Sequence, residues 1–203
     1  FLESNNVIST FPLFAAFFSH YMIKGDQLTF LRILGLAVAF LGTSVIVLRR
    51  GGLDVEEFSI WGAAIVLLSA SLLGFRLILS AKMVRQTEPT RVVVWMMILS
   101  LGVFMLGGII FEEIRWENFD WPPLVGILYQ GVVIAGFGFM AMGFLYKFYS
   151  PTLVSSFGFI SPVCGVLLSA WLLDEPLTWS IAIGTICVGA GLVLIAISKV
   201  ESG

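Results

Sequence analysis

The sequence predicts an all-α integral membrane protein, built as a bundle of seven transmembrane helices. Hydrophobic residues make up 59% of the chain and charged residues 12%, and the mean hydropathy is +1.02, far from the balance of a soluble domain. Seven uncharged stretches follow one another, most of them near the ~20 residues with which a helix crosses a ~30 Å hydrocarbon core. Membrane strands are disfavoured because they alternate apolar and polar residues, whereas these stretches are apolar on every face.

The predicted membrane segments are separated by short polar connections. In chain order the segments are residues 4–23, 33–48, 58–75, 92–111, 121–146, 148–173 and 176–198. All 13 acidic residues lie at or between the ends of these segments. We therefore expect the connections to be hydrated and their carboxylates, including that of Asp26, to lie in water.

Basic residues are distributed unevenly between alternate connections. One side of the membrane carries only Arg49, Arg50 and Arg115. Arg76 lies near the end of its helix that faces the other side and is counted with that side. The richer side holds Lys24, Arg32, Lys82, Arg85, Arg91, Lys147 and Lys199. The positive-inside rule places this richer side, and with it the C-terminus, in the cytoplasm. The net charge of -2 indicates no nucleic-acid partner.

The sequence contains few residues that could act in catalysis or bind a metal. Cys164 and Cys187 lie within apolar segments, where buried packing is favoured over a disulfide or a metal site. The chain has one histidine and contains neither a Gly-x-Ser-x-Gly nor a His-Glu-x-x-His motif. We therefore predict that the protein is not an enzyme and has no catalytic residues, no metal site and no cofactor.

The first two segments are repeated by the last two. Residues 5–48 align with residues 155–197 at an offset of about 150 residues. The matched pairs are Pro12 with Pro162, Ser19 with Ser169, Asp26 with Glu175, Leu28 with Leu177, Thr29 with Thr178, Gly35 with Gly184 and Gly42 with Gly191. A helix proline, an acid-x-Leu-Thr turn and two glycines recur in the same order, which favours a true repeat over coincidence.

The two copies are predicted to be inverted with respect to the membrane. They are displaced by an odd number of crossings, so their orientations are opposite. The turn of the first copy carries Lys24 and Arg32, whereas that of the second, at residues 174–176, carries no base. Secondary transporters use inverted repeats to build two related half-sites with alternating access. The repeat therefore predicts transport.

Each copy places small, polar and proline residues along one helix face. A proline displaces the hydrogen bond to the carbonyl four residues earlier, so such a face needs polar partners in protein or in a watery cavity. An amide within the membrane, as in Gln130, is likewise costly without a partner. The predicted substrate path is lined by Ser9, Pro12, Gln130, Ser155, Ser156, Phe159 and Pro162, with helix packing or structural hydrogen bonding as the alternative.

The repeated glycines are predicted to pack helices. Gly35 and Gly42 in the first copy, and Gly184 and Gly191 in the second, mark a seam that lets transmembrane backbones approach closely. For Arg76, an interfacial position at the cytoplasmic end of its segment is favoured over an anion-binding role.

A family resemblance is carried by residues 145–168, LYKFYSPTLVSSFGFISPVCGVLL, followed by Leu173-Asp-Glu-Pro-Leu-Thr and the helix that holds Gly184 and Gly191. This region resembles the end of an EamA-type permease of the drug/metabolite transporter superfamily, whose ten helices form two inverted five-helix halves. The resemblance implies that residues 1–50 are the last two helices of the first half, 51–58 an extracytoplasmic linker and 59–203 the complete second half. It also implies a fragment, because the chain begins at Phe1 without an initiator methionine or signal-peptide features.

The resemblance further implies a permease of the plasma (inner) membrane that exports a small metabolite, an amino acid or a drug by alternating access. Its expected partners are the lipid bilayer and a small-molecule substrate, and a homodimer is left open. One alternative is a nucleotide-sugar or phosphate translocator of the same superfamily, for which only Arg76 offers a cavity base. Another is a membrane scaffold that does not transport. The family's usual acidic turn is replaced here by Lys24-Gly25-Asp26 in the first copy.

Overall fold

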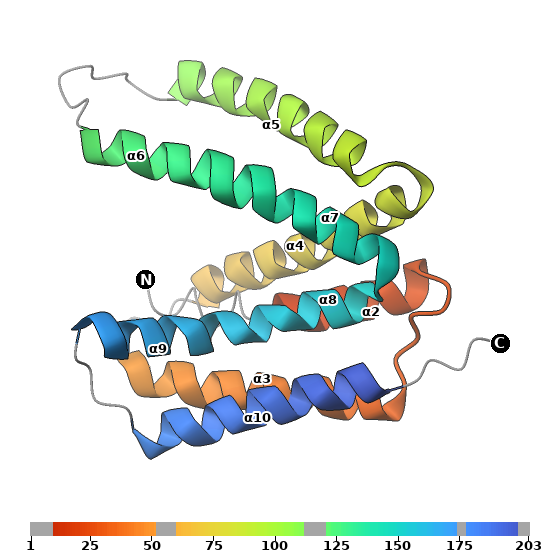
Figure 1. Cartoon of the computed structure of the whole chain (residues 1–203), viewed down its shortest axis with the longest axis vertical. Coiled ribbons are helices and arrows are strands. Elements are labelled where there is room, and N and C mark those ends of the chain that lie inside the picture. Colours follow the sequence, from red (N-terminus) through yellow and green to blue (C-terminus); the bar gives the residue numbers. More distant parts are fainter. Residues whose placement is uncertain (1–9, 52–59, 112–120, 174–177, 199–203) are drawn as a thin grey trace. The chain divides into compact units, whose positions relative to one another are not determined.

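A computed structural model describes residues 10–51, 60–111, 121–173 and 178–198 (Figure 1). Every regular element within these ranges is a helix, which confirms the predicted all-α class. Of the described helices, 6 are long and apolar enough to cross a membrane by length and composition. The first predicted segment is described only from residue 10 onward, because residues 1–9 lie outside the described ranges.

Most helices begin and end close to the predicted segments, but α4 continues well beyond the predicted end at residue 75. In chain order they are α2 (Phe11–Met22), α3 (Phe30–Gly51), α4 (Ile60–Gln86), α5 (Pro89–Phe111), α6 (Trp121–Tyr129), η3 (Gln130–Gly138), α7 (Phe139–Phe148), α8 (Pro151–Ser156), η4 (Phe157–Phe159), α9 (Ile160–Leu173) and α10 (Trp179–Ile197). Proline lies in the first turn of α2, α5 and α8, where its missing N–H would have no helical partner in any case.

Two membrane segments are interrupted α-helices. Between α8 and α9 the backbone tightens into the 3-10 turn η4, whose middle residue, Gly158, lies four residues before Pro162. The proline ring excludes a hydrogen bond to that carbonyl, which explains the local change of helix type. Between α6 and α7 the nine residues of η3 form a π-helix that contains Gly131, Gly136 and Gly138.

The chain divides into two compact units. Unit 1 comprises Phe1–Leu79 and Ser150–Gly203, and unit 2 comprises Ser80–Tyr149. The long helix α4 contributes its first part to unit 1 and its last turns to unit 2.

Within unit 1, α3 and α10 run antiparallel along a seam of glycines (Figure 1). A Cβ atom built on Gly35 would lie 2.7 Å from the carbonyl oxygen of Gly191, and one on Gly42 would lie 2.7 Å from the carbonyl oxygen of Gly184. Real Cβ atoms essentially never approach backbone atoms this closely. The seam therefore requires glycine at these positions, as small residues permit close packing of membrane helices.

The seam follows the register of the internal repeat. Gly35 is matched with Gly184 and Gly42 with Gly191, so applying the repeat to the Gly35–Gly191 contact yields the Gly184–Gly42 contact. The hydrophobic core beside the seam contains both members of two repeat-matched pairs, Ala39 with Val188 and Ile46 with Ile195. The α3 and α10 helices are thus related by a local two-fold arrangement of matched side chains.

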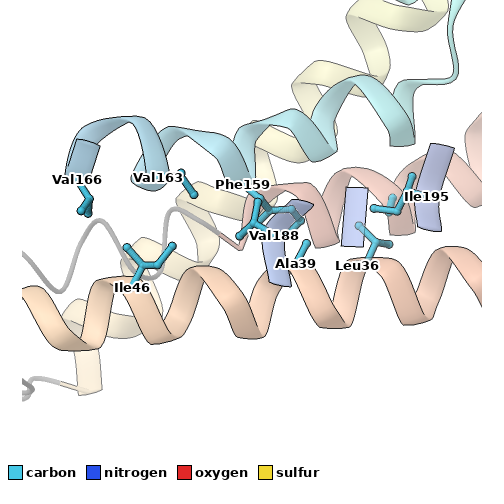
Figure 2. Packing of buried hydrophobic residues seen from close by; sticks show 9 residues of the cluster. Leu36, Ala39, Ile46, Phe159, Val163, Val166, Val188 and Ile195 are labelled. Atoms are coloured by element: carbon cyan, nitrogen blue, oxygen red, sulfur yellow. The ribbon is translucent and has the colours of Figure 1, made fainter. Parts of the chain in front are cut away.

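The same core joins the seam to the α8, η4 and α9 segment. Figure 2 shows Ala39 of α3 beside Phe159 and Val188, Leu36 of α3 beside Ile195 of α10, and Ile46 on the side of the core that faces Val163 and Val166. Phe159 is fully buried at 0% exposure. Close packing of this ring in the core cluster helps to hold η4 against α3.

Helix α2 is held between α8 and the first part of α4. A Cβ atom on Gly158 would meet the ring of Phe11, and a Cβ atom on Gly74 would lie 2.8 Å from the backbone nitrogen of Ala15. The rings of Phe18 and Phe75 meet edge to face with centroids 5.3 Å apart. Helix α2 thus packs against both α8 and the part of α4 that belongs to unit 1.

Unit 2 consists of the end of α4, α5, and the α6, η3 and α7 segment. The start of α5 packs on α7, where a Cβ atom on Gly143 would lie 3.3 Å from the Cβ of Pro89. Arg85 donates hydrogen bonds to the carbonyl oxygens of Tyr146 at 3.3 Å and Tyr149 at 3.2 Å, which satisfies the end of α7. Large apolar side chains are exposed along most of α5, as expected for a helix surrounded by lipid or by other membrane helices.

Candidate functional site: a buried ion-pair network

The strongest polar cluster in unit 1 lies where α2 connects to α3. Asp26 is 1% exposed and Arg32 is 4% exposed, and the two side chains form an ion pair. The expectation that Asp26 lies in a hydrated connection is therefore wrong. Charged side chains are almost never buried unless they are paired, and a buried pair also requires hydrogen-bond partners for its remaining polar atoms.

The α2–α3 connection turns sharply so that Asp26 points back into unit 1. Helix α2 ends at Met22, and Gly25 follows with a φ of 84°, a left-handed backbone that glycine adopts without a steric penalty. His20 stabilises the far side of the turn, because its Nδ1 accepts a hydrogen bond of 3.2 Å from the backbone N–H of Leu28.

Replacing Gly25 with alanine is expected to lower stability by about 1 kcal/mol, because a Cβ atom is unfavourable at positive φ. No neighbouring atom lies within 4 Å of that Cβ, so the cost would come from the backbone alone. Thermal unfolding of the purified protein in detergent would measure the loss. Gly25→Asn should lose less, since asparagine tolerates this conformation, and equal losses for both variants would contradict the explanation.

One carboxylate oxygen of Asp26 accepts three hydrogen bonds. Its Oδ2 accepts from Ser19 Oγ at 2.5 Å, from the backbone N–H of Thr152 at 2.9 Å and from Thr152 Oγ1 at 2.8 Å. The other oxygen, Oδ1, accepts from Nη1 of Arg32. The carboxylate thus receives donors from both of its oxygens, as a buried charge requires.

Arg32 extends the network to the ends of two further helices. Its Nε donates to Ser198 Oγ at 3.0 Å, directly after α10, and its Nη2 donates to Ser150 Oγ at 3.5 Å, directly before α8. Its Nη1 also donates to the carbonyl oxygen of Gln27 at 3.2 Å. We call this cluster the Asp26 network; it comprises Ser19, Asp26, Arg32, Ser150, Thr152 and Ser198.

The network also caps the start of α8. Ser150 Oγ accepts from the backbone N–H of Leu153 at 3.2 Å, while Asp26 accepts the backbone N–H of Thr152. Two of the N–H groups that a helix start leaves without helical partners are thereby satisfied. The negative carboxylate also lies at the positive end of the helix dipole, which is the favourable arrangement.

The role that this arrangement can play is structural. Its two charges neutralise each other, and the hydrogen bonds join the α2–α3 connection to the start of α8 and the end of α10. In the part of the chain that the structure describes, no group of three or more His, Cys, Asp or Glu side chains could hold a metal ion. The network can therefore hold helix ends together, and separating them would expose a charged pair.

Four of the predicted path residues are buried in unit 1. Ser155 and Ser156 are buried at 1% and 0% exposure, and their hydroxyls donate to the carbonyl oxygen of Thr152 at 3.2 Å and 2.6 Å. Phe159 follows in the core cluster, and Pro12 is buried in the first turn of α2. In this conformation these side chains lie within packed helix contacts rather than along an open channel.

The other predicted path residues are placed differently. Pro162 is half-buried at the start of α9, and Gln130 is the exposed first residue of η3 in unit 2. Ser9 lies outside the described residues. A surface groove of about 470 Å³ lies between α9 and α10 and has an almost wholly apolar lining, which suits a lipid chain better than a polar substrate.

The sequence contained partial signals for the Asp26 network. Ser150 directly precedes Pro151, a pattern typical of a helix start, and Asp26 stands at the acidic position of the repeat. Nothing in the sequence indicates that Arg32, counted among the cytoplasmic bases, turns inward, because its partners Ser150 and Ser198 are 118 and 166 residues away.

The described helices and their apolar lengths define a multi-pass α-helical membrane protein. The sequence profile of the EamA-like transporter family matches residues 60–197. The chain belongs to this family, which confirms the resemblance found in the sequence.

A protein of known crystal structure has a similar fold. It aligns with a TM-score of 0.83 at 18% sequence identity, over 97% of this chain and 68% of the other. No curated protein sequence matches the chain.

Proposed function

We propose that the protein is a secondary transporter that exports a small metabolite, amino acid or drug across the plasma membrane by alternating access. Membership of a transporter family supports the general class. The observation that carries the mechanism is the inverted register of the contacts in unit 1, where the Gly35–Gly191 and Gly42–Gly184 contacts are exchanged by the repeat. Two repeats whose helices pack through equivalent contacts can adopt two related arrangements, one open to each side of the membrane.

In this proposal, the contact between α2 and α8 is the closed inner half of the substrate route. Ser155 and Ser156 are polar, buried and bonded only to their own helix among the hydrogen bonds described, and Ala15 and Ala16 are 0% and 1% exposed on α2. Small residues let the two helices meet closely and part without large side chains to rearrange. Separation of α2 from α8 would line the route with the serines, Phe159 and Pro12.

The end of unit 1 that holds the Asp26 network is assigned to the cytoplasm. The positive-inside rule supports this orientation, with Lys24 exposed beside the network and the C-terminus on the same side. Residues 1–50 are proposed to end the first five-helix repeat, and residues 59–203 to form the second.

The substrate route is tested by replacing Ser155 and Ser156 together with alanine. Efflux of radiolabelled amino acids and metabolites from cells making the protein is expected to fall at least about tenfold, because polar groups that bind substrate in the transition between states are lost. The matched control is Ser69→Ala with Ser100→Ala, whose exposed hydroxyls donate to carbonyls of their own helices at 2.9 Å and 2.7 Å, as Ser156 does. Unchanged efflux in the double serine variant, at equal membrane abundance, would rule out this route.

A further inference from the structure

We propose that the Asp26 network is a latch that holds the cytoplasmic end of the route closed and so sets the resting balance between the two open states. This inference rests on the proposed transport function, and it assigns Asp26, Arg32 and Thr152 as positioning residues rather than substrate ligands. It follows from which elements the network joins, from its asymmetry between the two repeats and from the burial of its charges.

The network joins the parts that must separate if the route opens at this end. Asp26 belongs to the connection that follows α2, while Thr152 lies in the first turn of α8, 126 residues later in the chain. Thr152 supplies two of the three donors to Asp26 Oδ2. The buried serines Ser155 and Ser156 lie in the next turn of α8, so α2 and α8 cannot part beside them while these bonds persist.

Arg32 prevents the network from opening one bond at a time. Its guanidinium contacts Asp26 together with the residues that flank α8 and α10, Ser150 and Ser198. If α8 moved away, the carboxylate would lose Thr152 and the guanidinium would lose Ser150 in the same step. Coupled hydrogen bonds around buried charges break together, which makes the element two-state.

The arginine is present in only one of the two repeats. The register that matches Gly35 with Gly184 places Ile181 at the position of Arg32. Ile181 is half-buried and packs against the hydrophobic core. The helix scaffold is therefore matched between the repeats, whereas the residue at the repeat position of Arg32 is apolar and offers no guanidinium. The Arg32 contacts therefore stabilise the closed form at the Asp26 end, and the repeat-matched residue Ile181 cannot make the same contacts at the other end.

Loss of the Thr152 hydroxyl is the mildest test of the latch. Thr152→Val keeps the shape of the side chain and the backbone N–H bond to Asp26, and removes one hydrogen bond to a charged group. Such a bond is worth roughly tenfold or more in an equilibrium between closed and open forms. Asp26→Asn would remove the ion pair as well and should act more strongly.

The experiment measures which side of the membrane can reach the α2–α8 contact. The protein, expressed from its full coding sequence with Cys164→Ala and Cys187→Ala, carries the reporter Ser155→Cys. A membrane-impermeant thiol reagent is applied to inside-out and right-side-out vesicles. We expect Thr152→Val to raise the rate of labelling about tenfold in inside-out vesicles, with little change or a decrease in right-side-out vesicles. Thr90→Val, at an exposed threonine of α5, is the matched control and should change neither rate.

A second reporter separates opening from unfolding. Val188→Cys lies in the core beside the glycine seam, at 2% exposure in the native residue. A latch variant that opens the route leaves this reporter unlabelled, whereas a variant that unfolds exposes both reporters. Equal labelling of Ser155→Cys with and without Thr152→Val, or labelling of both reporters together, would overturn the latch.

Transport is measured separately, on vesicles that carry the same cysteine-free protein with its native Ser155, with and without Thr152→Val, and this comparison distinguishes the latch from the proposed function. Unchanged accessibility in vesicles that still carry out efflux means that the latch is wrong and transport stands. Increased accessibility from the inner side in a protein that moves no tested substrate means that the latch stands and the transport proposal fails.

Discussion

Replacing Asp26 with alanine is expected to destabilise the protein by about 3–5 kcal/mol, the loss typical when one member of a buried ion pair is removed. Arg32 would keep its buried charge without a counter-ion, and Ser19 and Thr152 would lose their shared acceptor. Thermal unfolding of the detergent-solubilised protein, monitored by size-exclusion chromatography, would show a lower midpoint temperature of unfolding. The yield of folded protein would also be lower.

Two comparisons make this prediction specific. Glu88→Gln removes an exposed carboxylate between α4 and α5 and should leave the midpoint within error. The double variant Asp26→Ala with Arg32→Met should be more stable than the sum of the two single losses predicts, because neither charge is then left alone. Additive losses would show that the two side chains do not act as a pair.

Replacing Gly191 with alanine is expected to destabilise the protein by about 1–3 kcal/mol, the usual cost of overpacking a well-packed contact. The new Cβ would lie 2.5 Å from the carbonyl oxygen of Gly35 and 2.6 Å from the backbone nitrogen of Ala39. Both obstacles are backbone atoms, so relief requires the α3 and α10 helices to move apart. Leucine at the same position should lower the yield of folded protein further.

The matched control lies two residues away on the same helix. Gly189 is exposed, and no atom lies within 4 Å of a Cβ built there, so Gly189→Ala should be neutral or slightly stabilising through helix propensity. The same thermal assay compares the two variants. If Gly189→Ala lost as much stability as Gly191→Ala, the close approach of the backbones would not be the cause.

The seam and the latch have different roles in the proposed mechanism. The contacts between α3 and α10 are apolar, close and matched between the repeats, so they have the properties of a fixed scaffold. The contact between α2 and α8 is stabilised at one end by polar bonds that water could replace. Movement is therefore expected at α2 and α8, while α3 and α10 remain together.

The predicted helix boundaries agree with the structure where a change in hydropathy alone marks the end of the helix. The start of α6 at Trp121 and the end of α5 at Phe111 coincide with the predicted segment ends, because both adjoin stretches rich in charge. The third segment was predicted to stop at residue 75, whereas α4 continues to Gln86. Arg76, Lys82 and Arg85 lower the hydropathy of those turns without breaking the helix, since arginine and lysine are good helix formers.

The sequence by itself determined the all-α membrane class, the family and the internal repeat, because apolar length and repeated residue order are properties of neighbouring positions along the chain. Only the tertiary structure decided that Asp26 and Arg32 are buried. Local polarity places both residues in a hydrated connection, but Thr152 and Ser198, brought close by helix packing, supply partners that water would otherwise provide. Burial of a charge depends on its partners in space, and these partners lie 126 and 166 residues away in the chain.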